Sequence, residues 1–356
     1  MNQILTDIMA VIGVVLNGLP QGLLALTFGF ASIPTALAFF VGAIGNTVTQ
    51  SVAPISFQAE TITYAGTAGK NRSECCTMVF FGAVIMTIIG CCGMLTKIVD
   101  FIGADIANGM MAGVGIMLAS TAIDMVKKEK VAGGVSLAVA LLTYVLTSQS
   151  SNTLVYTILA SVVASCVVTM IYGKVSKKEQ EAIVVVDDKF KRQKFTINSR
   201  VIMGALGMVC LNIGSNISFG AITASMAPNA NFNVDNLTVI SSVADMASSF
   251  FGGAPVESII SATAAAPHAV WCGVAMMLVI GVLLLAGILP KISKFVPPAS
   301  IAGFLFVLGV FKTVALDAPA ALATAPAVGG ITMVATAITN PFIGMIAGLI
   351  AKFIGL

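Results

Sequence analysis

The sequence predicts an all-α polytopic membrane protein, and its composition and charge pattern carry that prediction. Of the 356 residues, 58% are hydrophobic and only 9% are charged, with a mean hydropathy of +1.01. A soluble surface needs a far larger share of charged residues. The charges are also unevenly placed, since four long runs lack Asp, Glu, Lys and Arg: 8–59, 131–173, 258–290 and 318–351. Each run is long enough for one or two helices of about 20 residues across a bilayer.

Several other classes of protein are disfavoured by the same sequence. A net charge of +3 without a basic, aromatic stripe gives no nucleic-acid footprint. The seven cysteines lie mostly in apolar runs, which indicates core residues and not a disulfide framework. There is no P-loop, His-Glu-x-x-His or Cys-x-x-Cys motif, so we expect no enzyme, metal site or cofactor. The first residues lack the features of a signal peptide, and we expect a retained span in an inner (cytoplasmic) cell membrane.

Apolar length, together with Gly, Pro and Asn punctuation, predicts fourteen spans, seven in each half of the chain. The spans of the first half are 8–29, 31–50, 51–68, 75–98, 103–124, 131–149 and 153–173. Those of the second half are 201–223, 236–252, 254–266, 269–290, 299–315, 318–338 and 340–355. The chain is therefore expected to cross the membrane an odd number of times in each half.

A basic segment divides the chain almost in half. Residues 174–200 hold eight of the eighteen Lys and Arg residues, so we expect a first transmembrane repeat at 1–173, a basic linker at 174–200 and a second transmembrane repeat at 201–356. A shift of 194 residues gives seven identities in 23 positions, against roughly two expected by chance. The identical pairs are Gly93/Gly287, Leu95/Leu289, Lys97/Lys291, Ile98/Ile292, Phe101/Phe295, Gly109/Gly303 and Gly115/Gly309.

The orientation in the membrane depends on how the short spans are interpreted. With seven spans in each half, the second repeat is inverted relative to the first, and loops after odd-numbered spans hold fifteen of the eighteen Lys and Arg residues. The positive-inside rule then places the linker in the cytoplasm and both termini outside. If the two short spans were re-entrant, the linker would stay inside with cytoplasmic termini. Charge alone does not separate these alternatives.

Spans 3 and 10, residues 51–68 and 254–266, differ from the others. Both are short, both open near an Ala-Pro pair, and both contain a glutamate. A lipid-facing helix of full length avoids these features. Short, interrupted segments at corresponding places in two repeats indicate the binding site of a transporter. We therefore expect half-helices in spans 3 and 10 that meet in the middle of the membrane.

Carboxyl groups at membrane depth are costly and need a partner, a cavity or a function. Glu257 and Glu60 lie in the two short spans, and Asp245 precedes Glu257 by twelve residues. We interpret Glu257 as a substrate ligand that accepts hydrogen bonds, with a structural ion pair as the alternative. Glu60 and Asp245 are candidates for ion coupling, although a structural or interfacial role is nearly as plausible for each. Phe57 beside Gln58 can stack on a planar ring, or it can simply be packing.

Two stretches resemble a known family. The segment 244–264, ADMASSFFGGAPVESIISATA, and the segment 287–310, GILPKISKFVPPASIAGFLFVLGV, are similar to the xanthine/uracil permeases, the nucleobase–cation symporter family that includes the adenine/guanine/hypoxanthine permeases. The matching positions are Phe251, Gly252, Pro255, Gly287, Pro290, Lys291, Pro298 and Gly303. The pair Ser56-Phe57 likewise resembles a Ser-Phe pair that lines the family's substrate site in span 3.

The resemblance implies a seven-plus-seven inverted repeat with short strands in spans 3 and 10. Spans 1–4 and 8–11 would form a core domain, and spans 5–7 and 12–14 a gate domain. It implies import of a nucleobase, a purine or a uracil/xanthine type, by symport with a proton or sodium ion; a homodimer is left open. Glu257 would bind the ring N–H groups, and the base would be framed by Ser56, Phe57, Gln58, Ser261 and the backbone from Ala254 to Val256.

The sequence also departs from that family. No acidic residue lies between Val201 and Asn233, where typical members have one in span 8, and the family's span 10 glutamate aligns nearer Ser261 than Glu257. The alternative is the sulfate-permease and benzoate-transporter branch, which the first-span segment LPQGLLALTFGF (19–30) also resembles. An anion carrier needs positive potential, and helix N-termini would have to supply it because no Lys or Arg is expected at midplane. The carboxylate favours a nucleobase.

Overall fold

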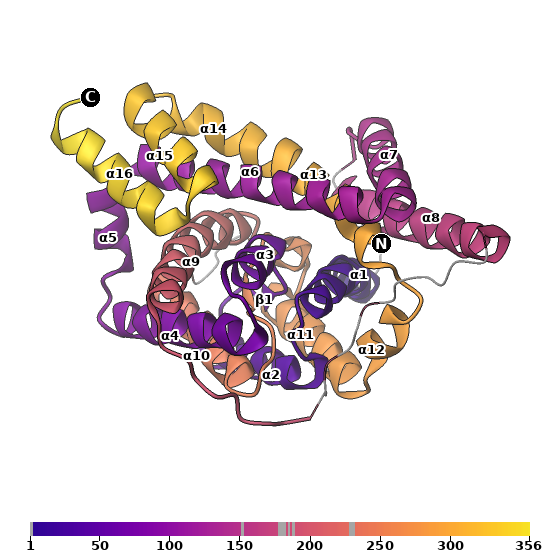
Figure 1. Ribbon diagram of the computed structural model, residues 1–356. Coiled ribbons are helices and arrows are strands. Elements are labelled where there is room, and N and C mark those ends of the chain that lie inside the picture. The colour runs from indigo at the N-terminus through magenta and orange to yellow at the C-terminus, as the bar shows by residue number, and fades with distance from the viewer. Residues whose placement is uncertain (1–2, 151–152, 177–182, 184–185, 187–188, 228–231) are drawn as a thin grey trace.

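The computed structural model describes residues 3–150, 153–176, 183, 186, 189–227 and 232–356. These residues are mostly helical and form two groups of helices, seen one above the other in Figure 1. The lower group contains α1 (Gln3–Thr27), α2 (Ser32–Thr49), α3 (Ala59–Ala68), α4 (Arg72–Cys91), α9 (Ser199–Ser225), α10 (Val234–Ser249) and α11 (Ala269–Leu285). Within it, α2 packs against α11 and α10, and α4 packs against α10 and α9. We call this group the first layer.

The second layer lies across the first. It contains α6 (Ala104–Lys128), α7 (Lys130–Leu146), α8 (Thr153–Ser176), α13 (Ala302–Val307), α14 (Ala315–Ala321), α15 (Pro326–Ile338) and α16 (Pro341–Phe353). A 3-10 turn at Pro298–Ile301 precedes α13, and a π-helical stretch at Leu308–Val314 joins α13 to α14, so that 298–321 is one continuous span. The predicted boundary at 315–318 is therefore wrong, because the chain turns only after α14 and restarts where Pro326 opens α15.

Two short helices connect the layers, α5 (Leu95–Ile102) and α12 (Ile288–Ser293). Each follows a glycine with a left-handed backbone, Gly93 at φ 62° and Gly287 at φ 63°. Glycine adopts this conformation without the steric cost that a Cβ brings, so it ends the preceding helix. The predicted spans 75–98 and 269–290 ran through these turns and were too long.

Seven of the described helices are long and apolar enough to cross a membrane. Another four, α7, α11, α15 and α16, are shorter and apolar. Large side chains such as Val48, Leu146 and Ile338 are exposed on the outside of the bundle, where a bilayer would cover them. The protein is a multi-pass membrane protein.

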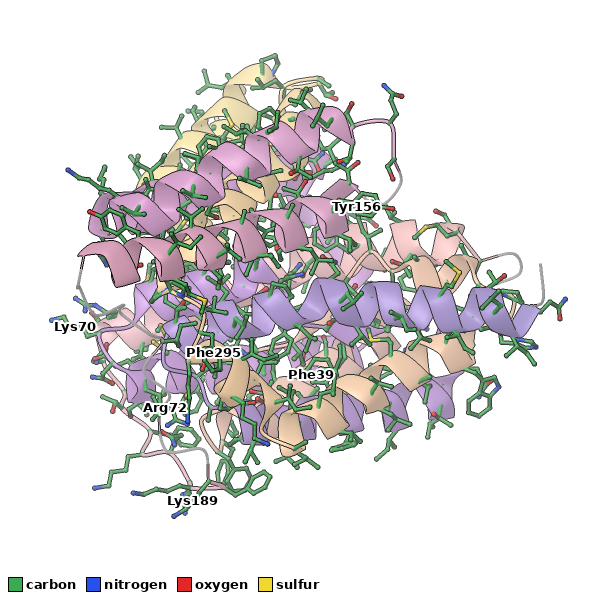
Figure 2. All side chains as sticks on the ribbon, turned by 90° about the vertical axis from the view of Figure 1, so that its right-hand side faces the viewer. Phe39, Lys70, Arg72, Tyr156, Lys189 and Phe295 are labelled. Atoms are coloured by element: carbon green, nitrogen blue, oxygen red, sulfur yellow. The ribbon has the colours of Figure 1, made fainter. Side chains whose placement is uncertain are left out.

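The described part of the basic linker runs along one end of the first layer. The Gln193 backbone N–H donates to the Phe250 carbonyl at 2.9 Å, and the Thr196 N–H donates to the Thr77 hydroxyl at 3.2 Å. Asn198 then caps α9 through its side chain, which accepts from the Val201 N–H. Lys70, Arg72 and Lys189 lie on the same side of the molecule (Figure 2). We call this end the linker face. Residues 177–182, 184–185 and 187–188 of the predicted linker lie outside the described residues.

Glycines permit a close approach between α6 and the π-helical stretch in the second layer. A Cβ added at Gly309 would come within 2.5 Å of the Gly115 carbonyl oxygen, and one added at Gly115 within 2.7 Å of the Gly309 carbonyl oxygen. Contacts this short are not available to any residue with a side chain. The helix α6 and the π-helical stretch therefore touch through two bare backbones.

We expect Gly309→Ala to lower thermal stability in detergent, because the added methyl overpacks this contact at a cost of about 1–3 kcal/mol. The matched control is Gly134→Ala in α7, where nothing lies within 4 Å of the new Cβ. Its melting temperature should stay level or rise, since alanine favours helix over glycine. Equal melting temperatures for the two variants would contradict the packing described here.

Candidate functional site

Two strands of two residues each meet in the interior. The strand β1 (Ile55–Ser56) pairs antiparallel with β2 (Glu257–Ser258), with Ile55 opposite Ser258 and Ser56 opposite Glu257. All four residues are buried. In a membrane interior every backbone N–H and C=O must find a partner within the protein, and strand pairing provides one where helices are interrupted. The prediction that spans 3 and 10 meet is confirmed, because β1 belongs to span 3 and β2 to span 10.

The segments that carry β1 and β2 each run from one end of the bundle to the other. Before β2, the Gly252 carbonyl accepts from the Arg72 guanidinium at 2.9 Å, at the linker face. After β2, the His268 ring lies 2.8 Å from the Asp7 carboxylate, at the opposite end. His268 is exposed. On the β1 side, Val52 packs with Ala227 and Ala264, while α3 ends beside Lys70.

The half-helix expected in span 3 is present as α3, but its counterpart in span 10 is not. After β2 the chain forms only a four-residue 3-10 turn, Ala262–Ala265. Pro267 follows and limits the turn, because proline lacks an N–H and restrains the residue before it. Ser261 caps this turn, and its hydroxyl lies 2.6 Å from the Thr263 hydroxyl. The Ser261 side chain is thus already engaged within its own segment.

The N-terminus of α3 is buried and uncapped. Gln58 occupies the N-cap position in an extended conformation, and its side chain makes no capping hydrogen bond. Its Oε1 accepts from the Thr61 hydroxyl, whereas its Nε2 is buried without a partner among the described residues. Gln58 is 4% exposed. A free amide donor and the positive end of a ten-residue helix therefore share one buried place.

Glu60 lies in the first turn of α3 and is 5% exposed. Its carboxyl group is beside Thr313 of the second layer and near its own backbone N–H. Asp317 of α14 also lies within electrostatic range of it. Glu60 therefore stands at the boundary between the two layers.

Asp245 and Glu257 form a second polar group, on the α9 and α10 side of β2. Both are fully buried, and the Glu257 carboxyl lies beside Asp245, Asn212 and Ser241. One Asp245 oxygen accepts from the Val256 N–H at 2.6 Å. Several buried oxygens here have no described hydrogen-bond partner: Asn212 Oδ1, Asn216 Oδ1, Ser242 Oγ, Asp245 Oδ2, both Glu257 oxygens and Ser258 Oγ. The described salt bridges involve neither carboxylate.

The backbone groups expected to frame a ligand are partly occupied. The Ala254 N–H donates to the Thr35 hydroxyl at 2.8 Å, and the Ala254 carbonyl accepts from Ser248 at 2.7 Å. The Val256 N–H is held by Asp245. These bonds fix the path of β2 and leave few donors for a substrate on that strand.

Ser56 and Phe57 face α1. The Phe57 ring packs against Phe39, with ring centroids 5.1 Å apart, and against Gly22 of α1. Gly18, one turn earlier, lets the Ser56 hydroxyl approach the same helix. Ser56 Oγ is buried without a described partner. The structure thus brings Ser56, Gln58 and Glu257 into one strand-paired region, whereas the Phe57 ring is taken up by packing.

Several residues of this region carried no signal in the sequence. Thr35, Ser241 and Ser248 are ordinary helix residues whose hydroxyls matter only because β2 lies beside them. Asn212 and Asn216 are polar groups in an otherwise apolar helix, and their spacing of four residues places them on one helix face. That spacing is the signal that joins them to Asp245 and Glu257.

Known structures share this fold. No protein-family model and no curated protein sequence matches the chain. The chain is similar to SLC26A9, with a TM-score of 0.72 and 12% identity over 99% of this chain and 65% of that one. It is similar to the murine Slc26a9 anion transporter in the inward-facing state, at TM-score 0.71 and 13% identity over 99% and 68%. It is also similar to the transmembrane domain of BicA, a cyanobacterium bicarbonate transporter, at TM-score 0.66 and 14% identity over 98% of both.

At such identities the likeness concerns the fold, and the chain has the fold of a multi-pass membrane transporter. The chain spans about two thirds, 65%, of SLC26A9. The assignment to the xanthine/uracil permeases, and with it nucleobase transport, is wrong, because the neighbours that share the fold are anion transporters.

The residues behind the resemblance explain this error. Gly252 at φ 87° and Gly287 at φ 63° hold left-handed turns, and Pro298 opens a 3-10 turn. These residues form turns that interrupt helices, so their presence in the sequence does not indicate which substrate is bound.

We expect Asp245→Leu to lower thermal stability in detergent by about 1–3 kcal/mol, because the buried Val256 N–H loses its acceptor. Asp245→Asn keeps an oxygen at Oδ1 and should stay much closer to the unchanged protein. Thermal unfolding of the two variants measures the difference. The role given to Asp245 in holding β2 is excluded if the leucine variant is as stable as the asparagine variant.

Proposed function

We propose that the chain is a secondary transporter of small anions, in the manner of the sulfate-permease type of carrier. The single observation that carries this proposal is the buried, uncapped N-terminus of α3 with the unpartnered Gln58 Nε2 beside it. A helix N-terminus offers free N–H groups and the equivalent of about half a positive charge. The N–H groups and the partial positive charge both attract an anion and repel a cation. The fold shared with Slc26a9 and BicA, an anion and a bicarbonate transporter by name, supports the same substrate class.

Donors of this kind suit a substrate that must leave again. Of the described Lys and Arg residues, none is buried. A full positive charge in a dry interior would bind an anion tightly, whereas backbone N–H groups and one amide bind it through hydrogen bonds of moderate strength. The site is therefore suited to turnover. Ser56 Oγ, also buried and unpartnered on β1, is the nearest hydroxyl along the chain.

Glu60 modifies this picture, because a carboxylate in the first turn of α3 competes with a bound anion. We assign it to ion coupling. With a proton on Glu60, the competing negative charge disappears and the anion has sole use of the helix end. Its place beside Thr313 and near Asp317 means that its charge also acts on the second layer. Proton movement and layer movement are linked at this residue.

The Asp245 and Glu257 pair supplies a second coupling position. Two neighbouring carboxylates without a basic partner are too costly to remain bare in a membrane interior. The surrounding oxygens of Asn212, Asn216 and Ser258 lack hydrogen-bond donors among the described residues. Oxygen ligands of this kind accept a proton or a sodium ion. We therefore propose that the pair takes up the coupling cation while the anion binds in front of α3.

We also propose that the two layers are the core and gate domains of a seven-plus-seven inverted repeat with fourteen crossings. The similar φ angles of Gly93 and Gly287, 62° and 63°, support a repeat of 194 residues, as does the contact between Gly115 and Gly309. Equivalent residues that touch one another are what a two-fold axis between repeats produces. With fourteen crossings, the basic linker face lies in the cytoplasm and both ends of the described chain lie outside.

We expect proteoliposomes containing the protein to take up radiolabelled sulfate or bicarbonate. Gln58→Leu should raise KM about tenfold or more, because a lost hydrogen bond to a charged group costs about 1.5–3 kcal/mol. The control, Gln3→Leu, changes an exposed glutamine at the start of α1 and should leave uptake unchanged. Absence of uptake of any anion by the unchanged protein would overturn the proposed function. An unaltered KM in Gln58→Leu would show that the N-terminus of α3 does not bind the anion.

Coupling is tested by accumulation against a gradient. In Glu257→Gln vesicles, an imposed proton or sodium gradient should drive about tenfold less accumulation, since about 1.4 kcal/mol of lost coupling is a factor of ten. Anion exchange at equilibrium should persist. The matched control is Asp124→Asn, which removes an exposed carboxylate paired with Lys127. Full gradient-driven accumulation in Glu257→Gln would show that the pair does not couple.

A further inference from the structure

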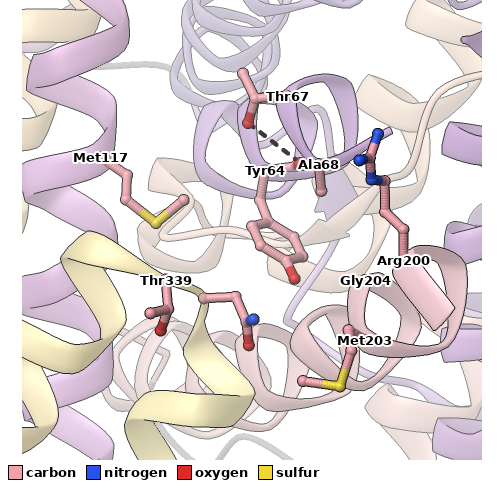
Figure 3. A pocket seen from close by; sticks show the side chains of 9 residues that line it. Tyr64, Thr67, Ala68, Met117, Arg200, Met203, Gly204 and Thr339 are labelled. Carbon is pink, nitrogen blue, oxygen red and sulfur yellow. Dashed lines mark hydrogen bonds between the residues drawn. The ribbon is translucent and has the colours of Figure 1, made fainter. Parts of the chain in front are cut away.

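A cavity opens between the two layers, away from the strands. Its volume is about 220 Å³, and it is lined by α3, α6 and α9 and by the turn between α15 and α16. Figure 3 shows the Tyr64 ring pointing from α3 into this space, with Arg200 of α9 to one side and Thr339 and Met117 opposite. Because Arg200 begins α9 where the linker ends, the cavity lies toward the linker face. We call it the vestibule.

Tyr64 brings an unpartnered hydroxyl to the vestibule. The residue is 3% exposed, and its ring lies against Gly207, where any Cβ would overlap the hydroxyl. No hydrogen bond of this hydroxyl occurs among the residues that the structure describes. A buried phenol normally finds a partner. The hydroxyl is therefore available to a molecule inside the vestibule.

Arg200 brings the positive charge. It lies in the first turn of α9 and forms no salt bridge within the described part of the chain. Arg200 interacts electrostatically with the carboxylate of Glu74. Both Glu74 oxygens already accept hydrogen bonds, from the Lys70 N–H at 2.9 Å and from Asn198 Nδ2 at 3.0 Å. The Arg200 guanidinium thus keeps its donors for another ligand.

A further donor comes from the second layer. Asn340 caps α16, and its Oδ1 accepts from the Ile343 N–H at 3.0 Å. Its Nδ2 has no partner among the described contacts, so it can donate. One guanidinium, one phenol and one amide, all donors, therefore surround a space that holds several waters of about 30 Å³ each.

We propose that the vestibule is a second anion site, which binds a small oxyanion on its way between the linker face and the first site, at the N-terminus of α3. The proposal rests on the proposed function, since it names a further station for the same class of substrate. Arg200 supplies the charge, and Tyr64 and Asn340 supply neutral donors from opposite layers. The bound anion touches both layers, so its occupancy depends on how far they are apart. Arg200 raises the local anion concentration and acts on capture more than on turnover.

Binding is measured directly by protection of an engineered thiol. Met203 lines the vestibule, and Met203→Cys is placed in a chain with Cys91→Ser and Cys92→Ser, the two exposed cysteines. The protein is held in phosphatidylcholine nanodiscs and labelled with a neutral maleimide, with and without sodium sulfate. Sulfate should slow labelling severalfold. Arg200→Gln should abolish this protection, whereas Lys191→Gln, which removes an exposed linker charge, should not.

The same variants separate this inference from the proposed function. Gln58→Leu should keep the protection, because the vestibule does not contain it. In transport, Arg200→Gln should raise KM about fivefold at low salt with kcat unchanged, and the effect should shrink as salt screens the charge. Protection that persists in Arg200→Gln overturns the vestibular site, as does protection that appears only when anionic phosphatidylglycerol replaces phosphatidylcholine. Failure of all anion uptake with intact protection overturns the transport proposal alone.

Discussion

The antiparallel contact between β1 and β2 is the interaction on which the rest of the site depends. A chain that interrupts a helix inside a membrane leaves backbone N–H and C=O groups that lipid does not satisfy. Pairing Ile55 with Ser258 and Ser56 with Glu257 satisfies them and joins segments about 200 residues apart. The same pairing ends just before α3 begins, so it sets the place of that helix's N-terminus, which the Gln58 side chain does not cap.

Small residues make this arrangement compact. Gly18 and Gly22 allow α1 to lie against Ser56 and Phe57, and Gly115 and Gly309 let the second layer close on itself. Side-chain hydroxyl groups accept hydrogen bonds from backbone N–H groups that strand pairing leaves over, as the Thr35 hydroxyl does for the Ala254 N–H. Among the described residues, the buried polar atoms without a partner include Gln58 Nε2 and a cluster of oxygens around Glu257. Such groups are costly in an apolar interior, so each one needs a partner, a ligand or a function.

Much of the architecture could be predicted from the sequence, because it depends on local chemistry. Apolar runs predict most of the spans, and the two Ala-Pro segments predict interrupted helices that meet, whereas the strands themselves are implied only by the family resemblance. The missing helix after β2 was harder, since Ala262 to Ala265 favours a helix and only Pro267 argues against one. The substrate class could not be predicted from Gly252 or Gly287, because these residues serve the backbone. Nor could the vestibule, since Tyr64, Arg200 and Asn340 meet only in the folded chain.

The most direct test of the central claim is a structure determined in the presence of selenate, with anomalous data at the selenium edge. A site in front of α3 predicts a peak within about 3 to 4 Å of Gln58 Nε2 and of the first backbone N–H groups of the helix. A second, weaker peak beside Arg200 is compatible with that result. Selenium found only at the surface, with none before α3 at saturating selenate, would contradict the account.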